Sequence, residues 1–111
     1  MASTEFLSAK EIFEQLPSTD QIQRKDIVEV SRSLFENGRE LMFAIADQIE
    51  PDQQFCMSVQ AHLSQVADLL EQRLVSAEDI SRKDATFVCD VILATRERAG
   101  EVLQLVTGRL G

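Results

Sequence analysis

Apolar residues recur along most of the chain at intervals of three and four, the period that places them on one face of an α-helix. The first such segment predicts a helix over about residues 4–16, capped by Ser3 or Thr4 and ended by Pro17. Its apolar face consists of Phe6, Ala9, Phe13 and Leu16. This segment is therefore predicted to be a short amphipathic helix.

The second predicted helix is the longest and runs from about residue 20 to residue 49, behind the cap residues 18–20. No proline interrupts it, and Gly38 is its one weak position because glycine is a poor helix former. At about 1.5 Å per residue, an unbroken helix of this length would measure roughly 45 Å. Pro51 marks the break that follows it.

Two further amphipathic helices are predicted, one over about residues 52–74 and one from the polar turn at 76–84, with a cap candidate at Ser81, to about residue 108. The apolar face of the third predicted helix consists of Cys56, Val59, Leu63, Val66, Leu70 and Leu74. That of the fourth consists of Val88, Ile92, Thr95, Ala99, Val102, Val106 and Leu110. Because the connections are short, consecutive helices should lie antiparallel. The pattern predicts an all-α fold, an antiparallel four-helix bundle with a short first and a long second helix, as one domain over residues 1–111.

The second predicted helix carries two adjacent apolar columns, each with a spacing of seven residues. The first column consists of Ile27, Leu34 and Leu41, and is widened by Val30 and Ile45. The second column consists of Val28, Phe35, Met42 and Ile49. Phe43 lies almost opposite the first column on a helical wheel. The apolar surface therefore spreads well beyond the stripe of about 100° that a surface helix needs.

Three arrangements would account for this excess of apolar surface. In the first, the helix is central in its own bundle. In the second, it forms a homodimer together with the fourth helix, where Phe87 and Leu93 also lie outside the main apolar stripe. In the third, it lines a groove for a foreign helix. Phenylalanine and methionine suit an adaptable contact surface, because methionine repacks easily and phenylalanine supplies a large area. The candidate partner-binding residues are Val28, Phe35, Met42, Phe43 and Ile49.

The composition of the 111 residues is ordinary for a globular domain, and the absence of Trp and Tyr with only two prolines favours helices. The net charge of −8 disfavours nonspecific binding to nucleic acid or to an anionic membrane. No apolar run approaches the roughly 20 residues of a membrane span, and the first residues lack the pattern of a signal peptide. Cys56 and Cys89 fall within apolar helical runs, which suggests buried or half-buried thiols in a reducing compartment. A cytoplasmic protein with no nucleic-acid or membrane partner is expected.

His62 is the only histidine, and it lies at the flank of the apolar face of the third predicted helix. A single mid-helix histidine at the edge of a four-helix bundle resembles a histidine phosphotransfer domain. In that family a lysine and then a glycine shortly follow the histidine, whereas here the sequence is Ala61-His62-Leu63-Ser64-Gln65. An ordinary surface histidine is therefore the favoured interpretation, with phosphotransfer as the alternative.

Two pairs of carboxylates, Glu11-x-x-Glu14 and Asp68-x-x-Glu71, resemble the metal-binding pairs of all-helical nucleotide pyrophosphohydrolases, which hold Mg²⁺ inside a bundle. On helical wheels, Glu11, Glu14 and Asp68 point away from the apolar faces. These carboxylates should therefore be solvated and should not converge on a metal ion. With no glycine-rich phosphate loop and no legible Ser/His/Asp or Cys/His arrangement, no catalytic, metal-binding or cofactor-binding residue is predicted.

Arg24-Lys25 and Arg82-Lys83 each begin a long predicted helix, and in an up-down bundle those two helices run parallel. The four cations would then share one end of the bundle, where they could bind a phosphate or an acidic tail. An aspartate follows each pair and partly neutralises it, so ion pairing at the helix starts is the commoner explanation.

Residues 18–30 match residues 76–88 at several positions, including the Arg-Lys-Asp triplet in each. A duplicated helical hairpin would produce such a match, and so would two helix starts that are alike by coincidence. The sequence leaves both explanations open.

These patterns together favour a non-enzymatic protein-binding factor, such as a small acidic chaperone, inhibitor or regulatory protein. It would act by docking an apolar helix face onto a protein partner or onto a second copy of itself, and a homodimer is expected. A histidine phosphotransfer-like signalling domain and a metal-dependent all-helical nucleotide hydrolase are the alternatives from other function classes.

Overall fold

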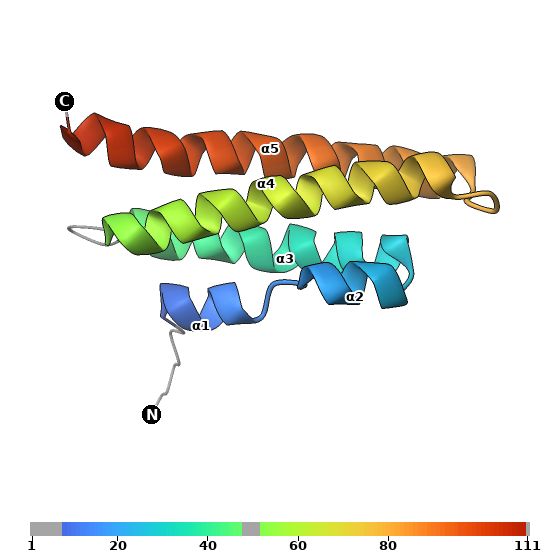
Figure 1. Ribbon diagram of the computed structural model, residues 1–111, viewed down its shortest axis with the longest axis horizontal. Coiled ribbons are helices and arrows are strands. Elements are labelled where there is room, and N and C mark those ends of the chain that lie inside the picture. The colour runs from blue at the N-terminus through green and yellow to red at the C-terminus, as the bar shows by residue number, and fades with distance from the viewer. Residues whose placement is uncertain (1–7, 48–51, 111) are drawn as a thin grey trace.

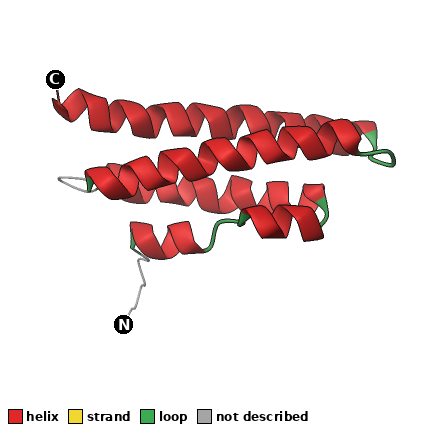
Figure 2. Cartoon of the chain, viewed as in Figure 1, coloured by secondary structure: helices red, strands yellow, loops and turns green. Residues whose placement is uncertain are grey.

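The chain folds as four antiparallel rods of α-helix, the first of which contains two short helices (Figure 1). The computed structural model describes residues 8–47 and 52–110, with side chains described up to residue 107. The helices are α1 (Ala9–Glu14) and α2 (Thr19–Arg24) in the first rod, then α3 (Ile27–Ala46), α4 (Gln53–Ser76) and α5 (Arg82–Leu110). This described part of the chain contains no strand (Figure 2). The predicted all-α antiparallel bundle is confirmed.

The helix predicted over residues 20–49 is divided in the structure into α2 and α3. Lys25 and Asp26 both adopt extended backbone conformations between the two helices. Asp26 Oδ1 accepts a hydrogen bond from the backbone N–H of Val28 at 2.7 Å and so caps α3. Aspartate is a poor residue inside a helix but one of the best at its N-cap, and no apolar residue lies between Ile22 and Ile27, so a new helix starts here. This corrects the prediction of one unbroken helix, and α2 extends the first rod instead.

The predicted start of the first helix near residue 4 is also corrected, because α1 begins at Ala9. Ser8 and Glu11 form a reciprocal capping box, in which each side chain accepts the other residue's backbone N–H at 3.2 and 3.1 Å. The residues proposed as the cap and first apolar position lie outside the described residues: Ser3, Thr4 and Phe6. The predicted cap of the last helix is confirmed, since Ser81 Oγ accepts the backbone N–H of Asp84 at 3.1 Å.

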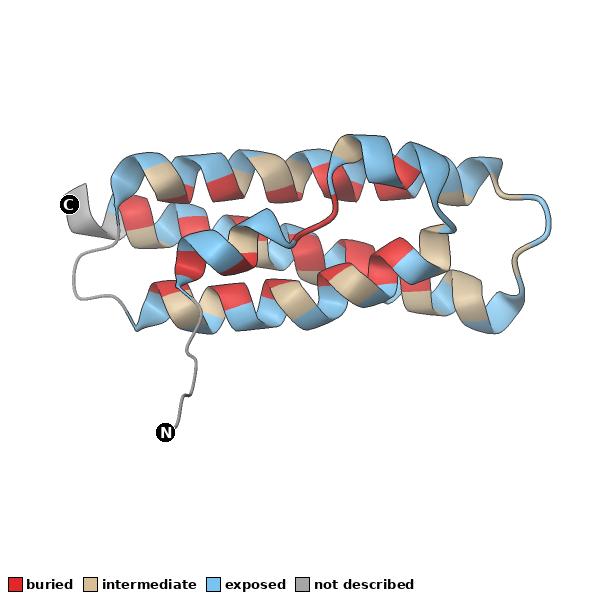
Figure 3. Cartoon of the chain, turned by 90° about the horizontal axis from the view of Figure 1, so that it is seen from below, coloured by how far each residue is buried: buried red, intermediate tan, exposed pale blue. Residues whose placement is uncertain are grey.

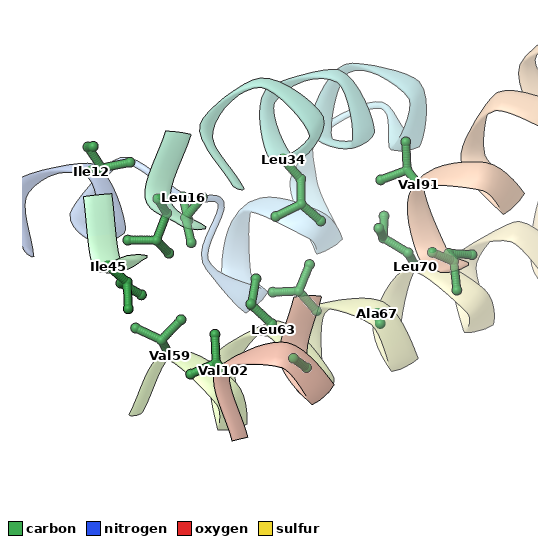
Figure 4. Packing of buried hydrophobic residues seen from close by; sticks show 14 of the residues in the cluster. Ile12, Leu16, Leu34, Ile45, Val59, Leu63, Ala67, Leu70, Val91 and Val102 are labelled. Carbon is green, nitrogen blue, oxygen red and sulfur yellow. The ribbon is translucent and has the colours of Figure 1, made fainter. Parts of the chain in front are cut away.

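The core is a continuous cluster of aliphatic side chains contributed by all four rods (Figure 4). Its fully buried members include Leu34, Leu41 and Ile45 of α3, Val59, Leu63 and Leu70 of α4, and Val88, Val91 and Val102 of α5. The predicted inner faces of α4 and α5 are buried as expected, except that Leu74 is only partly buried and the side chain of Leu110 is not described. Each large aliphatic side chain buried in this way contributes about 1.5–3 kcal/mol relative to an exposed one.

The rods pack so that α3 keeps one side open to solvent. α5 packs most closely against α4 and also packs against α3, while α1 and α2 cover α3 and α4 from the other side. Buried positions line the inward sides of the helices and exposed positions the outward sides (Figure 3). Over residues 8–47 and 52–110, no helix combines the length and the apolar character needed to span a lipid bilayer.

The matching segments 18–30 and 76–88 differ in local structure. Residues 19–24 form α2, whereas residues 77–81 form the non-helical turn between α4 and α5. The two segments become alike only where α3 and α5 begin. This favours two similar helix starts over a duplicated hairpin.

Replacing either helical glycine with alanine is expected to raise the free energy of unfolding by about 0.5–1 kcal/mol, because alanine loses less backbone entropy in a helix. A Cβ atom at Gly38 would meet only Arg98 Cδ, at 4.0 Å, and one at Gly100 would meet nothing within 4 Å. Neither glycine has a positive φ angle. Urea unfolding of Gly38→Ala and Gly100→Ala measures the change, and a loss of stability in either variant would contradict the helix packing described here.

Candidate partner-binding face

The two apolar columns of α3 lie in different surroundings. Leu34 and Leu41 of the first column are fully buried in the core. In the second column Val28 and Met42 are partly buried against the core, and Phe35 is 41% exposed. The Phe35 ring meets the Phe87 ring of α5 edge-on, with centroids 6.4 Å apart. Val28, Phe35 and Met42 therefore lie along the seam between α3 and α5, where they are only partly covered.

Phe43 projects from the outward side of α3 and is 61% exposed. The guanidinium carbon of Arg39, one helical turn earlier, lies 5.9 Å from the centroid of the Phe43 ring. This is the geometry of a cation–π contact, which attracts a cation to the ring face. Arg39 thus covers part of the ring, and the remainder is open to a binding partner.

Two hollows border Phe43. The larger, of about 620 Å³, lies between α3 and α5 and is lined by Arg39, Met42, Phe43, Ala46, Arg98, Glu101, Gln104 and Leu105. The smaller, of about 400 Å³, is lined by Phe35, Glu36, Arg39, Glu40 and Phe43. The surface formed by these two sets of residues is called the α3–α5 face below. It carries two arginines and three glutamates, so its net charge is −1, whereas the whole chain carries −8.

The structure brings together three of the five candidate partner-binding residues. Phe35, Met42 and Phe43 all belong to the α3–α5 face. Val28 belongs instead to the far end of α3, about 21 Å from Met42 along the helix axis, and Ile49 lies outside the described residues.

Sequence reasoning missed the contribution of α5 to this face. Arg98, Glu101 and Leu105 follow one another at helical spacing, on the side of α5 that faces α3. Their spacing of three and four was legible in the sequence. The helix that these residues face depends on how the rods pack, and the apolar pattern of one helix does not predict that packing.

Other exposed apolar side chains lie outside both hollows. On α5 these are Leu93, which is 63% exposed, and Leu103, and on α4 they are Met57 and Val75. Single exposed apolar residues are normal on soluble proteins and need no partner. Leu93 therefore offers a matched control position for substitutions at Phe43.

The proposed anion-binding residues do share one end of the bundle. Near them, a hollow of about 230 Å³ is lined by residues of both turns: Asp26, Ile27, Val28, Ala77, Asp79, Ile80 and Asp84. Arg24, Lys25, Arg82 and Lys83 are all exposed and do not line it. The lining residues include three aspartates and no lysine or arginine, which disfavours an anion there.

His62 holds the connection between α1 and α2 against α4. Its Nε2 atom lies 3.0 Å from the carbonyl oxygen of Pro17, and its ring meets the Phe13 ring edge-on at 5.3 Å between centroids. Because a carbonyl oxygen only accepts, Nε2 is the donor in this hydrogen bond. Burial lowers the pKa of His62, and the hydrogen bond to Pro17 opposes this shift. His62 is thus half-buried and engaged, rather than the ordinary surface residue that the sequence favoured.

The lowered pKa of His62 predicts a pH-dependent stability. His62 binds a proton less readily in the folded state than in the unfolded state. Its contribution to the free energy of unfolding is therefore fully present above the ordinary pKa of 6.5. It is lost as the pH falls from 6.5 through the lower pKa of the folded protein. Urea unfolding of the wild type and of His62→Gln over this pH range isolates the effect, because the chain has no other histidine. If the free energy of unfolding changed with pH in the same way in the two proteins, the predicted effect of His62 would be contradicted.

Three of the four paired carboxylates, Glu11, Asp68 and Glu71, have hydrogen-bond partners in the protein. Asp68 and Glu71 both accept hydrogen bonds from Nη2 of Arg96 on α5, at 3.0 and 2.8 Å, and Glu71 and Asp68 raise the pKa of Arg96. The Ser8 backbone N–H lowers the pKa of Glu11 in the capping box. Glu11, Glu14 and Asp68 are exposed, as predicted, and Glu71 is exposed as well. Across the described residues, no three His, Cys, Asp or Glu side chains gather as a metal site would require.

The two cysteines differ in exposure. Cys56 is buried, as expected, whereas Cys89 is exposed, which corrects the expectation of two covered thiols. Val88 points into the core, and each helical residue is rotated by about 100° from the one before it. Cys89 is therefore turned to the outer side of α5.

Comparison of this chain with protein-family models, with curated proteins and with solved structures finds no match. What the chain does must therefore be inferred from the chemistry and shape of its own surface. Within residues 8–47 and 52–107, the α3–α5 face combines exposed aromatic side chains, hollows and arginines.

Proposed function

We propose that this chain is a non-enzymatic protein-binding factor, a small chaperone, inhibitor or regulatory protein, and that it binds its partner through the α3–α5 face. The observation that carries the proposal is Phe43, a largely exposed ring set between two hollows on a helix that the core holds in place. An exposed ring alone is unremarkable, but a ring bordered by hollows and further apolar side chains is typical of contact surfaces.

The residue types of the face support this function. Phenylalanine, methionine and arginine are enriched in protein–protein interfaces, whereas lysine is depleted. The α3–α5 face contains Phe35, Met42, Phe43 and two arginines, and no lysine lines either hollow. Phe43 borders both hollows and has charged residues beside it, which suits a central anchor in a binding surface.

The shape of the face suits a helical segment of a partner. A seam between two helices, with apolar residues along its floor, accepts the apolar side of an amphipathic helix. Met42, Ala46 and Leu105 are the apolar residues that line the larger hollow beside Phe43. Because the core holds α3 and α5 in place, the face is preformed. Binding a partner therefore does not cost the free energy of ordering these helices.

The enzymatic alternatives have less support from the geometry. A phosphoryl-accepting histidine needs a ring nitrogen that a partner can reach, and Nε2 of His62 is engaged by the Pro17 carbonyl. A metal-dependent hydrolase needs convergent carboxylates, and Asp68 and Glu71 are engaged by Arg96. Neither observation favours a second function.

A cytoplasmic location is part of the proposal. An exposed thiol such as that of Cys89 persists best in a reducing compartment. The net charge of −8 makes copies of the chain repel each other except over the near-neutral α3–α5 face. This repulsion lets a chain with an apolar contact surface stay in solution.

Affinity purification from the source cells tests the proposal with three versions of the chain as bait: wild type, Phe43→Asp and the control Leu93→Asp. Both substitutions replace an exposed apolar residue with the same charge. A protein retained by the wild type and by Leu93→Asp but lost with Phe43→Asp is the expected result. Equal retention by all three baits would place binding elsewhere on the chain and contradict the proposal.

A further inference from the structure

The α3–α5 face has a projection and a recess side by side, which is the shape that a two-fold contact needs. In a two-fold dimer the same patch meets itself, so it must contain both halves of each contact. Phe43 is the projection, and the larger hollow beside it is the recess. A cavity of about 150 Å³ suffices for a benzene ring. The hollow of about 620 Å³ therefore has room for a phenyl ring with arginine stems around it.

The charges of the face fit the same arrangement. Arg39 and Arg98 stand among Glu36, Glu40 and Glu101, so each copy offers both signs to the other. With a net charge of −1, the face is the surface over which two chains of net charge −8 can approach with little repulsion.

We infer that the occupant of the α3–α5 face is a second copy of this chain, docked by a two-fold axis that passes beside Phe43. This deepens the proposed function and rests on it, since it names the partner of the same face. Each Phe43 ring enters the larger hollow of the other copy. Because Phe43 itself lines that hollow, the two rings lie next to each other across the axis.

The mass of the protein in solution tests directly whether two copies associate. Sedimentation equilibrium of the full chain over a wide concentration range is expected to show twice the chain mass of 12.5 kDa. Phe43→Asp is expected to weaken self-association at least about 30-fold, because it removes a central aromatic anchor and places two like charges close to each other across the axis. The control Leu93→Asp should remain dimeric, and circular dichroism checks that both variants keep their helices.

A mixing experiment tests the symmetry. Phe43→Asp and Phe43→Arg should each be monomeric alone, because like charges would face each other across the axis. An equal mixture should recover the dimeric mass, since the axis then pairs opposite charges. Failure of the mixture to associate would overturn the placement of Phe43 at the axis.

The outcomes separate this inference from the proposed function. A wild-type chain that stays at 12.5 kDa at every concentration overturns the dimer, even if Phe43→Asp loses a foreign protein in the affinity purification, and the proposed function then stands alone. A dimer that survives Phe43→Asp but is disrupted by Leu93→Asp also overturns it, because the contact is then elsewhere. A dimer lost only with Phe43→Asp supports it.

Discussion

Replacing Leu41 with alanine is expected to lower the free energy of unfolding by about 2–5 kcal/mol. Leu41 is fully buried in α3 and belongs to the apolar column that faces the core. Its truncation removes buried apolar surface and leaves a cavity that a close-packed bundle fills only in part. Urea unfolding followed by circular dichroism measures the loss.

Phe43→Ala is the matched control for this prediction. Phe43 lies two residues further along the same helix and is mostly exposed, so its truncation in dilute protein should change stability by no more than about 0.5 kcal/mol. A comparable loss in the two variants would contradict the assignment of one side of α3 to the core and the other to binding.

Replacing Phe13 with alanine is expected to lower the free energy of unfolding by roughly 2–3 kcal/mol, somewhat less than a fully buried phenylalanine would. Phe13 is half-buried and meets two rings of α4 edge-on, Phe55 at 5.5 Å and His62 at 5.3 Å between centroids. These contacts anchor the short helix α1, which six residues could not keep helical alone. The variant should therefore lose protection from amide hydrogen exchange in α1 before the rest of the bundle.

Glu14→Ala controls for the effect of any substitution in α1. Glu14 is the exposed residue next to Phe13, and its truncation should leave both stability and exchange close to those of the wild type. If Phe13→Ala behaved like Glu14→Ala, the aromatic contacts would not be what holds α1 to the bundle.

Much of the fold was predictable because the apolar period is a strong and local signal. The inner faces of α4 and α5 follow directly from that period, and Ser81 marks the start of α5. The break between α2 and α3 was not predicted, because no proline or glycine marks it, although the step from Ile22 to Ile27 is five residues rather than three or four. A hydrogen bond from the Val28 N–H to Asp26 caps α3 at this break.

Only the part of the candidate site that lies on α3 could be predicted from the sequence. The excess apolar surface of α3 identified Phe35, Met42 and Phe43 before any partner helix was known. The hollows depend on α5, whose Arg98 and Leu105 reach α3 only through the packing of the whole bundle. Likewise, the engagement of His62 depends on Pro17, which lies 45 residues away in the chain.

The binding role of the α3–α5 face is tested most directly by the dissociation constant of folded Phe43→Asp compared with that of the wild type. The constant is measured for self-association and for any protein that the wild type captures. A protein-binding face predicts affinity at least about 30-fold weaker, with the circular dichroism spectrum unchanged. A dissociation constant equal to that of the wild type would show that Phe43 faces no partner, and would contradict the proposed function.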